Sequence, residues 1–231
     1  MGSHYEKGGK EVELASNLLN SRPDLNVVYD IGANKGEWTL GIKQSVNRNL
    51  DFYLFDPLEY LAKKRSSSCS FATNFVVVLS DKNKKVEWFD RGPSGKGYGA
   101  SYYKETTPQY KNVKPIIKQA RTLDSIVEEY LLPTPDLLKI DTQGSELDIL
   151  KGAVNLLEKG VKFVQLEVVK PGKRLQYNAP KYEEYIFYME KMGIKCIRTT
   201  KRPKKKNQIL ILFLKGLGNE ENHIPNIRRF I

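Results

Sequence analysis

The stretch L-L-K-I-D-T-Q-G-S-E-L-D-I-L-K-G, from Leu137 to Gly152, decides the fold of this chain. Its first four residues are apolar except for Lys139 and run into Asp141, which indicates a buried strand that stops at an acidic end. A polar turn follows, and Ser145 can cap a helix with Glu146 in its first turn, where the helix dipole favours acid. Ligand sites of α/β sheets lie at such strand ends, so the stretch predicts a site.

The rest of the chain alternates apolar runs with segments of helical periodicity. Strands are predicted at Val27 to Ile31, Asp51 to Phe55, Phe75 to Leu79, Leu137 to Ile140, Val161 to Val169, Ile194 to Arg198 and Gln208 to Leu214. Helices are predicted at Glu11 to Asn20, Glu37 to Val46, Thr122 to Leu131, from Ser145 to the stop at Gly160, and at Lys181 to Met192, with a further helical face from Leu58. This alternation predicts an α/β fold with a mostly parallel, doubly wound sheet.

The length of 231 residues fits one domain with appendages. We expect a tag remnant and a short helix over residues 1–24, a single domain over 25–216, and a tail over 217–231. An insertion is expected around residues 84–121, where glycines interrupt short tyrosine-rich pieces. We expect this insertion to be β-rich or irregular and to cover the site.

The histidine and cysteine content and the apolar runs limit which kinds of catalytic site, metal site and cellular location we expect. The two histidines, His4 and His223, lie in the expected tag remnant and tail, which argues against histidine-based nucleophiles and a His-rich metal site. The two cysteines, Cys69 and Cys196, lie in different kinds of segment, which favours a reduced, cytoplasmic protein over a disulfide. The longest apolar run, from Ile209 to Leu214, is too short to span a membrane, and no signal peptide is expected.

The chain carries a net charge of +11, with a basic cluster from Lys201 to Lys206. Such a patch attracts nucleic acid, anionic glycans or a membrane surface, and the alternative is a solvated turn.

A second glycine-bearing segment, V-Y-D-I-G-A-N-K-G, ends at Gly36. Gly32 and Gly36 let the backbone approach a ligand at the start of a helix, although the spacing is not that of dinucleotide binders. Asp56 ends the next strand, where a carboxylate can accept the hydroxyls of a ribose. The alternative interpretation of the glycine segment is a tight strand–helix turn, and that of Asp56 is a helix-start residue before Pro57. Together the segments predict an adenosine ligand, and the missing third glycine favours S-adenosylmethionine over NAD.

These segments, with T-L-D-S-I from Thr122 and V-Q-L-E-V-V from Val164, make the chain resemble the FkbM family of S-adenosylmethionine-dependent methyltransferases. The resemblance covers residues 27–169 and implies a Rossmann-like class I fold. That fold has a mostly parallel seven-stranded sheet with helices on both faces and an antiparallel closing strand. One departure is Asp56, since the family usually has Glu before the proline.

The resemblance also implies roles for individual residues. Residues implied to hold the methionine part of the cofactor are Asp30, Gly32, Asn34 and Gly36; Asp56 would bind the ribose, and Ser80 and Asp81 would lie near the adenine. Residues implied to face the methyl group and the acceptor are Lys139, Asp141, Gln143, Glu146 and Glu167. We count Gln143 among the cofactor-binding residues and Asp141, Lys139 and Glu167 as catalytic candidates.

Methyl transfer needs a positioned acceptor and a base that removes its proton. Strand alternation places Lys139 and Asp141 on one face, where Lys139 needs a partner such as Asp141 or Glu167. The alternative interpretation of Lys139 and Asp141 is a structural salt bridge. A divalent metal held by Asp141 and Glu167 is a further hypothesis, which we do not favour.

The resemblance implies O-methylation of a carbohydrate or another hydroxylated small molecule. The alternatives are a nucleic-acid methyltransferase that uses the basic face and a non-catalytic, Rossmann-like nucleic-acid-binding module. Tyrosines that can stack on a sugar ring or simply pack are Tyr98, Tyr102, Tyr103 and Tyr177. The sequence predicts neither the acceptor nor the oligomeric state.

Overall fold

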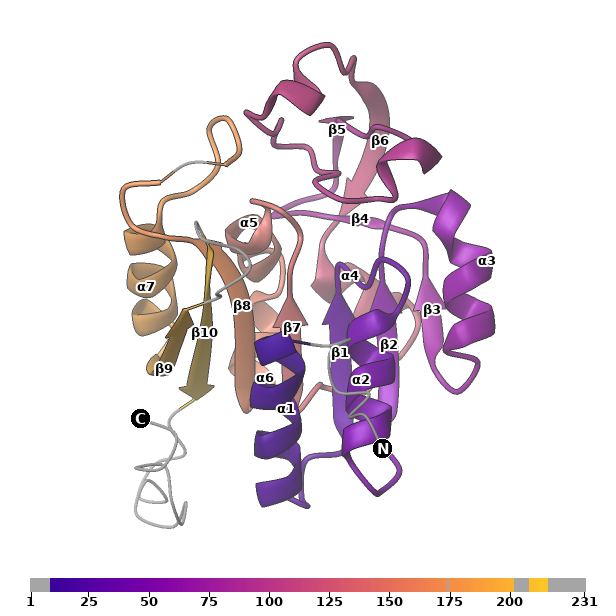
Figure 1. The fold of residues 1–231 in the computed structure, drawn as a ribbon. Helices are drawn as coiled ribbons and strands as arrows, with labels where there is room; N and C mark the ends of the chain where they lie inside the picture. The colour runs from indigo at the N-terminus through magenta and orange to yellow at the C-terminus, as the bar shows by residue number, and fades with distance from the viewer. Residues whose placement is uncertain (1–8, 174, 202–207, 216–231) are drawn as a thin grey trace.

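Seven strands form one sheet in the order β3-β2-β1-β7-β8-β10-β9 (Figure 1). The computed structural model describes residues 9–173, 175–201 and 208–215. The strands are β1 (Val27–Ile31), β2 (Asp51–Phe55), β3 (Thr73–Phe75), β7 (Leu137–Ile140), β8 (Phe163–Val169), β9 (Ile194–Lys201) and β10 (Gln208–Lys215). Within this sheet, neighbouring strands among β3, β2, β1, β7 and β8 pair in parallel, and β10 is antiparallel to both of its neighbours, β8 and β9. The predicted sheet and its antiparallel closing strand are confirmed.

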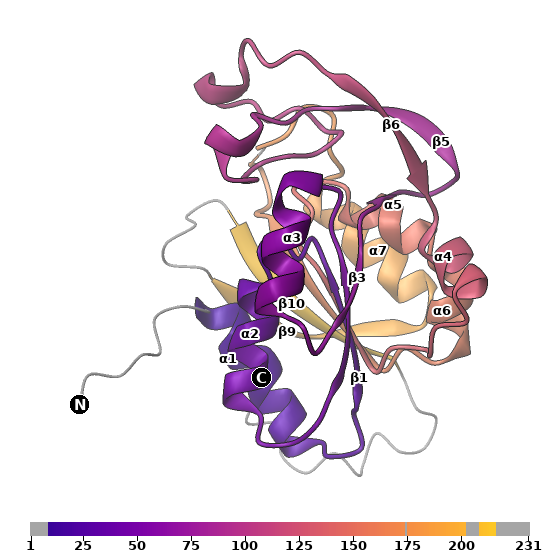
Figure 2. The ribbon, with the colours of Figure 1, turned by 90° about the vertical axis from the view of Figure 1, so that its right-hand side faces the viewer.

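Helices cover both faces of the sheet, which is why β7 is buried along its whole length (Figure 2). On one face lie α1 (Gly9–Ser21), α2 (Glu37–Ser45) and α3 (Glu59–Ser68). On the other face lie α4 (Leu123–Glu129), α5 (Glu146–Lys151), α6 (Val154–Lys159) and α7 (Tyr182–Lys191). Alternation along β1 sends Val28 and Asp30 toward α1 and α2 and sends Tyr29 and Ile31 into the core beneath the other helices.

The third predicted strand is divided between two sheets. β3 ends at Phe75, and β4 (Val78–Leu79) pairs with β6 (Ile116–Arg121) in a separate three-stranded sheet. The apolar run from Phe75 to Leu79 predicts extended chain, but it cannot specify which partner strand that chain meets.

The single helix predicted to run from Ser145 to Gly160 is also divided, at Gly152. A Cβ atom on Gly152 would lie 2.1 Å from the carbonyl oxygen of Ser80, so the two backbones touch there. The carboxylate of Asp124, from α4, accepts hydrogen bonds from the backbone N–H groups of Asn155 (2.8 Å) and Leu156 (3.1 Å). This contact caps α6 from a neighbouring helix, which a local sequence pattern does not reveal.

Residues 84–121 form a layer above the carboxyl ends of the sheet strands (Figures 1 and 2). The strand β5 (Lys84–Trp88) is antiparallel to β6, and two short 3₁₀ turns, η1 (Pro93–Gly95) and η2 (Pro108–Tyr110), lie between them. We call this segment the roof.

Two tyrosines attach the roof to α5. The hydroxyls of Tyr102 and Tyr103 donate to the same oxygen, Oδ2 of Asp148, over 3.0 and 2.8 Å. Their rings pack against each other with centroids 5.0 Å apart. Burial, together with the Asp148 carboxylate, raises the pKa of both tyrosines, so they stay neutral hydrogen-bond donors.

Cys69 and Cys196 are both free, Cys69 buried and Cys196 exposed. No helix within the described ranges combines the length and the apolar character needed to cross a membrane. Of the basic cluster, residues 202–206 lie outside the described residues, as do His4 and His223.

We predict that Asp148→Ala lowers the free energy of unfolding by about 1–3 kcal/mol, because two partly buried tyrosine hydroxyls lose their acceptor. Urea denaturation of the wild type and the variant measures the difference. Tyr177→Phe is the control, because the side chain of Tyr177 is 67% exposed and its change should leave stability within about 0.5 kcal/mol. Equal stability of Asp148→Ala and the control would show that the tyrosine contacts do not hold the roof.

Candidate active site

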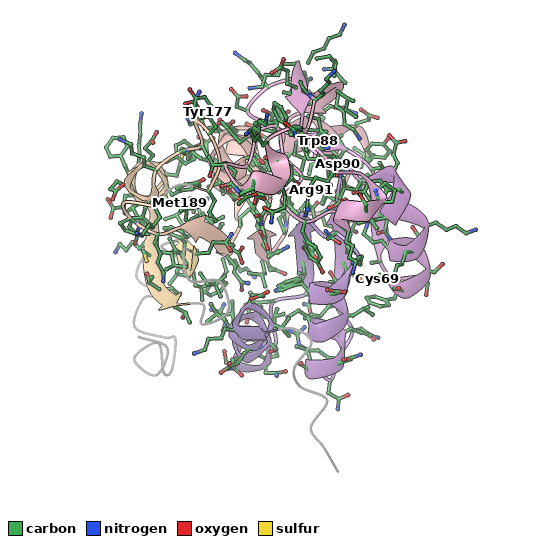
Figure 3. All side chains as sticks on the ribbon, turned by 45° about the horizontal axis from the view of Figure 1, so that its top comes forward. Cys69, Trp88, Asp90, Arg91, Tyr177 and Met189 are labelled. Atoms are coloured by element: carbon green, nitrogen blue, oxygen red, sulfur yellow. The ribbon has the colours of Figure 1, made fainter. Side chains whose placement is uncertain are left out.

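A cavity of about 650 Å³ lies between the carboxyl edge of the sheet and the roof. Its floor comes from the turns after β1, β2 and β7, from the start of β10 and from the first turn of α1; its walls and cover come from the roof and from residues 175–176. Figure 3 looks onto this edge and shows Trp88, Asp90 and Arg91 of the roof between Tyr177 and Cys69. Trp88 and Arg91 line the cavity. A cavity of this size suits a small-molecule ligand.

The turn after β1 fits together only because two of its residues are glycines. Gly32 has φ 77°, and a Cβ atom there would lie 1.9 Å from the carbonyl oxygen of Asp141. Gly36 has φ 81°, and a Cβ atom there would lie 2.5 Å from Sγ of Cys69. Asn34 lies between them with φ 49°. The glycines therefore let this turn pack directly against the turn after β7 and against α3.

The buried carboxylate of Asp30 pairs with Lys139. Lys139 Nζ lies 2.8 Å from Asp30 Oδ1, and the hydroxyl of Thr39 donates to Asp30 Oδ2 over 2.7 Å. The ammonium also donates to the carbonyl oxygens of Ile31 (3.3 Å) and Gly32 (3.2 Å). Burial opposes the charged form, but the carboxylates of Asp30 and Asp141 outweigh it and raise the pKa of Lys139, so the side chain is a cation at neutral pH.

This pairing corrects the expectation that Lys139 pairs with Asp141 or Glu167. Asp30 and Lys139 are direct neighbours in the parallel register of β1 and β7, so their side chains project from the same face. The sequence does not contain this register. Lys139 lines the cavity, but its three protons are committed to the β1 turn.

Asp56 lines the cavity and also holds the turn after β2. Its Oδ2 accepts from the N–H of Asn34, and its Oδ1 accepts from the N–H of Leu58, both over 2.9 Å. The guanidinium of Arg65 lies 3.4 Å from Oδ1 and donates to the carbonyl oxygen of Asn34 over 2.7 Å. Burial raises the pKa of Asp56 even though Arg65 opposes the shift. A carboxylate can accept about four hydrogen bonds, so this one retains capacity for a ligand hydroxyl.

Asp141 and Gln143 lie in the turn after β7, on the floor of the cavity. Both residues line it, and Gln143 Nε2 donates to Asp141 Oδ1 over 2.7 Å. Gln143 has φ 61°, an uncommon conformation for a residue with a side chain, which aims the carboxamide back at Asp141. The Asp141 carboxylate is therefore fixed in direction at the cavity.

Glu146 does not line this cavity. Its carboxylate accepts from the N–H groups of Thr142 (2.8 Å) and Gly144 (3.0 Å) and from the hydroxyl of Tyr185 (3.2 Å). Burial raises its pKa against the effect of these backbone hydrogen bonds. The side chain turns inward to close the loop that carries Asp141, and it lines a smaller hollow beside the cavity.

Glu167 lines a smaller hollow beside the main cavity, with Gln143, Gln176 and Gln208. Asp141 does not line that hollow, so the two carboxylates of the metal hypothesis face different spaces. Within the described part of the chain, no group of three or more His, Cys, Asp or Glu side chains is arranged to hold a metal.

Ser80 and Asp81 lie away from the cavity, at the base of the roof. Ser80 Oγ donates to Asp81 Oδ1 over 3.0 Å, and Asp81 pairs with Lys84 over 2.6 Å. The chain leaves the main sheet at Phe75, so these residues follow β4 in the second sheet and not the end of β3.

Several cavity residues carried no signal in the sequence. They are Glu11 from α1, Trp88 and Arg91 from the roof, and Gln176 and Gln208 near β8 and β10. Of the four tyrosines considered for stacking, Tyr98 lines the cavity; the residue is 55% exposed, and Lys35 Nζ lies 5.1 Å from the ring centroid. Tyr102 and Tyr103 instead anchor the roof to α5.

We predict that Lys139→Met lowers the free energy of unfolding by about 3–5 kcal/mol, because it leaves a buried carboxylate without its cation. The double variant Asp30→Asn, Lys139→Met should recover part of this loss, since both charges are gone. Lys84→Met is the control, because the Lys84–Asp81 pair is about one-third exposed and should contribute under about 1 kcal/mol. Chemical denaturation near neutral pH measures all three variants, and a Lys139→Met loss no larger than that of Lys84→Met would contradict the prediction.

The loss of unfolding free energy at alkaline pH gives a second test of the Asp30–Lys139 pair. The raised pKa of Lys139 means that its contribution is complete below the ordinary value of 10.5 and is lost as the pH rises through the raised value. Lys139→Met should lack this component of the alkaline loss.

Comparison with solved structures places the fold among methyltransferases. The methyltransferase FkbM from Methylobacillus flagellatus matches with a TM-score of 0.56 at 14% identity, over 82% of this chain and 44% of that one. The O-methyltransferase from Bacillus cereus, solved with S-adenosylhomocysteine, matches with a TM-score of 0.55 at 11% identity, over 92% of this chain and 84% of that one. The magnesium protoporphyrin IX methyltransferase from Synechocystis, solved with S-adenosylmethionine, gives 0.53 at 11% identity, over 90% and 79%.

A curated relative is the hexuronic acid methyltransferase AglP of Haloferax volcanii. It is 25% identical over 155 residues, which are 65% of this chain and 59% of AglP, so the chain matches less than two-thirds of that relative's length. The model of the methyltransferase FkbM domain matches residues 30–196, which include the β1 turn, Asp56 and the stretch from Leu137 to Gly152. The chain therefore belongs to the FkbM methyltransferase family.

Proposed function

We propose that the protein is an S-adenosylmethionine-dependent O-methyltransferase that methylates a hydroxyl group of a carbohydrate. The observation that carries the proposal is the meeting of the β1 turn, Asp56 and Asp141 on one cavity. Family membership and the methyltransferase fold support the reaction class.

The cofactor half of the cavity lies over β1 and β2. The residues from Gly32 to Asn34 bring backbone close to the space, and Asp56 adds a carboxylate with remaining hydrogen-bond capacity. These features fit the methionine and ribose parts of S-adenosylmethionine, which supplies an electrophilic methyl group from its sulfonium when bound. Asp30 and Lys139 support this half by fixing the turn from behind. Ser80 and Asp81 have no place in the proposed cofactor site, since they do not line the cavity.

Asp141 is the proposed base. Lys139 is excluded from that role because it is a cation with its protons committed, and Glu146 because its carboxylate is committed to the turn. Gln143 aims the Asp141 carboxylate by donating to one of its oxygens. Asp141 would accept the proton of the acceptor hydroxyl while that oxygen forms its bond to the methyl carbon, and the bond from the methyl carbon to the cofactor sulfur would break, leaving S-adenosylhomocysteine.

A carbohydrate acceptor is supported by three observations. The relative AglP is named as a hexuronic acid methyltransferase. The exposed ring of Tyr98 at the cavity offers an apolar face of the kind that packs on a sugar ring. Carboxamides of Gln109, Gln143, Gln176 and Gln208 add neutral hydrogen-bonding groups to the lining. The nucleic-acid alternatives rest on the basic cluster, of which residues 202–206 lie outside the described residues, and they stay hypotheses.

The proposal is tested in two steps. Calorimetry measures the binding of S-adenosylmethionine and S-adenosylhomocysteine, for which we expect micromolar dissociation constants. Transfer of a labelled methyl group is then assayed on a panel of glycosides, oligonucleotides and simple alcohols, with and without EDTA. Failure to bind either cofactor form would refute the methyltransferase function, and transfer to oligonucleotides alone would refute the carbohydrate acceptor.

We predict that Asp141→Asn lowers kcat by about 10²–10⁴-fold, because it removes the proton acceptor. Its affinity for S-adenosylhomocysteine should stay within about threefold of the wild type, because the β1 turn is held by Asp30 and Lys139 and not by this carboxylate. Asp51→Asn, an exposed change at the start of β2, is the control. Full activity of Asp141→Asn would show that this carboxylate is not the base.

We predict that Gly32→Ala abolishes cofactor binding, because the added methyl group would lie 1.9 Å from the backbone of Asp141. Gly172→Ala is the matched control: Gly172 has a similar φ of 70°, but no atom of the described residues lies within 4 Å of its would-be Cβ. Both variants carry the strain of a side chain in the left-handed region, about 1–2 kcal/mol. Calorimetry with S-adenosylhomocysteine should therefore show loss of binding for Gly32→Ala only, and equal affinities would contradict the packing argument.

A further inference from the structure

Three glutamines stand where the main cavity meets the smaller hollow beside it. Gln143, Gln176 and Gln208 line both spaces. The side chains of Gln176 and Gln208 are nearly inaccessible to bulk solvent, at 2% and 7% exposed. Within the described ranges, no group donates a hydrogen bond to Oε1 of Gln176, although that atom is buried. A buried polar atom of this kind is costly unless a ligand or solvent satisfies it.

The backbone on both sides of Gln176 is held by the roof. Residue 176 forms a β-bridge with Glu105. The N–H of Thr106 donates to the carbonyl oxygen of Leu175, and the N–H of Tyr177 donates to that of Lys104, each over 2.7 Å. The side chain packs against Gly144, where a Cβ atom would lie 3.3 Å from Gln176 Cγ. Gln176 is therefore held in place before any ligand arrives, which limits the entropy lost on binding.

The position of these glutamines separates them from the cofactor half. The sheet order β2-β1-β7-β8-β10 places the turns that carry Gly32 and Asp56 on one side of β7 and places β8 and β10 on the other. Gln176 follows β8, and Gln208 begins β10. Asp141, at the end of β7, lies between the two halves. A group held by the glutamines is thus on the far side of the proposed base from the ribose site.

The chemistry of a carboxamide matches a hydroxyl group. The amide offers both an acceptor oxygen and N–H donors without charge, and a hydroxyl both donates and accepts. One of the two Nε2 protons of Gln143 is engaged by Asp141, so toward a ligand this residue presents its oxygen and one remaining N–H. A carboxylate group on a ligand, in contrast, is bound best by hydrogen-bond donors and cationic side chains.

We propose that Gln176 and Gln208, together with the side-chain oxygen of Gln143, form an acceptor subsite for uncharged hydroxyl groups adjacent to the one that is methylated. The subsite selects a ring with neighbouring hydroxyls, such as a neutral pyranose unit, and directs one of them to Asp141. This inference rests on the proposed function, because it assigns the acceptor side of that same cavity.

A competing recognition group lies on the roof. The Nε atom of Arg91 is buried and has no hydrogen-bond partner among the described residues, and the guanidinium lies 5.3 Å from the ring centroid of Tyr110. A guanidinium favours an anionic acceptor such as a uronate. The experiment therefore has to separate a neutral sugar from its uronate.

The probes are methyl α-D-glucopyranoside, methyl α-D-mannopyranoside and methyl α-D-glucopyranosiduronate, each titrated into the full chain saturated with S-adenosylhomocysteine. Binding is followed by saturation-transfer NMR and calorimetry. The variants are Gln176→Leu, Gln208→Leu and Arg91→Met, with Gln119→Leu on the exposed face of β6 as the matched control. The affinity for S-adenosylhomocysteine reports whether each variant is folded.

We expect at least one neutral glycoside to bind, and we expect Gln176→Leu and Gln208→Leu each to weaken it about tenfold or more. Arg91→Met and Gln119→Leu should leave that binding unchanged, and all variants should bind S-adenosylhomocysteine as the wild type does. Two independent glutamine variants protect the test against a local packing fault in one of them.

Three outcomes would overturn the inference. Unchanged glycoside binding in both glutamine variants would remove the subsite while leaving the methyltransferase function intact. Binding of the uronate alone, lost in Arg91→Met, would move recognition to the roof. No binding of any glycoside to a chain that still binds S-adenosylhomocysteine would refute the subsite, whereas failure of S-adenosylhomocysteine itself to bind would refute the proposed function.

Discussion

The buried ion pair between Asp30 and Lys139 fixes the relative position of the two turns on which the site depends. Removing both charges from water is expensive, and the geometry offsets this cost because each proton of the ammonium has an acceptor in Asp30, Ile31 or Gly32. The pair holds the turn after β1 against the turn after β7. A glycine is required there because a Cβ atom at Gly32 would overlap the carbonyl oxygen of Asp141. The cofactor half of the cavity and the proposed base are thereby set by one contact between neighbouring strands.

The acidic residues around the turns after β1, β2 and β7 differ in their hydrogen-bond partners. Asp30 is paired with Lys139, and Glu146 accepts the amides of its own turn. Asp56 is held by two amides and by Arg65, which is 0% exposed, and retains a small remaining capacity that suits a ribose hydroxyl. Asp141 differs because it accepts a hydrogen bond from Gln143 of its own turn, and both side chains line the cavity. The proposed functions of these chemically similar residues thus differ because their hydrogen-bond partners differ.

Local sequence patterns predicted those parts of the structure that depend on neighbours along the chain. Strand ends are local, so Asp141, Asp56 and the glycine turn were placed correctly at one edge of the sheet. Properties that depend on distant segments were not predictable: the register that pairs Lys139 with Asp30, and the departure of the chain after Phe75 that takes Ser80 away. The glutamines at 176 and 208 belong to no motif, and only the folded chain brings them together at the cavity. Sequence patterns therefore locate the proposed cofactor half better than the proposed acceptor half, which is the part of the cavity beside Gln176 and Gln208.

This difference follows from how the two halves are built. The cofactor half uses short turns that leave adjacent parallel strands, so a few residues at fixed spacing determine it. The acceptor half depends on segments that are far from it in the sequence. Tyr102 and Tyr103 of the roof bind Asp148 of α5, and Glu105 of the roof forms a β-bridge with Gln176. The roof can change in length and sequence without disturbing the Asp30–Lys139 pair, because none of its residues takes part in that contact. A scaffold of this design can keep one cofactor site while its acceptor surface diverges, and under the proposed function the contacts that join the roof to α5 and to residue 176 would set the choice of acceptor.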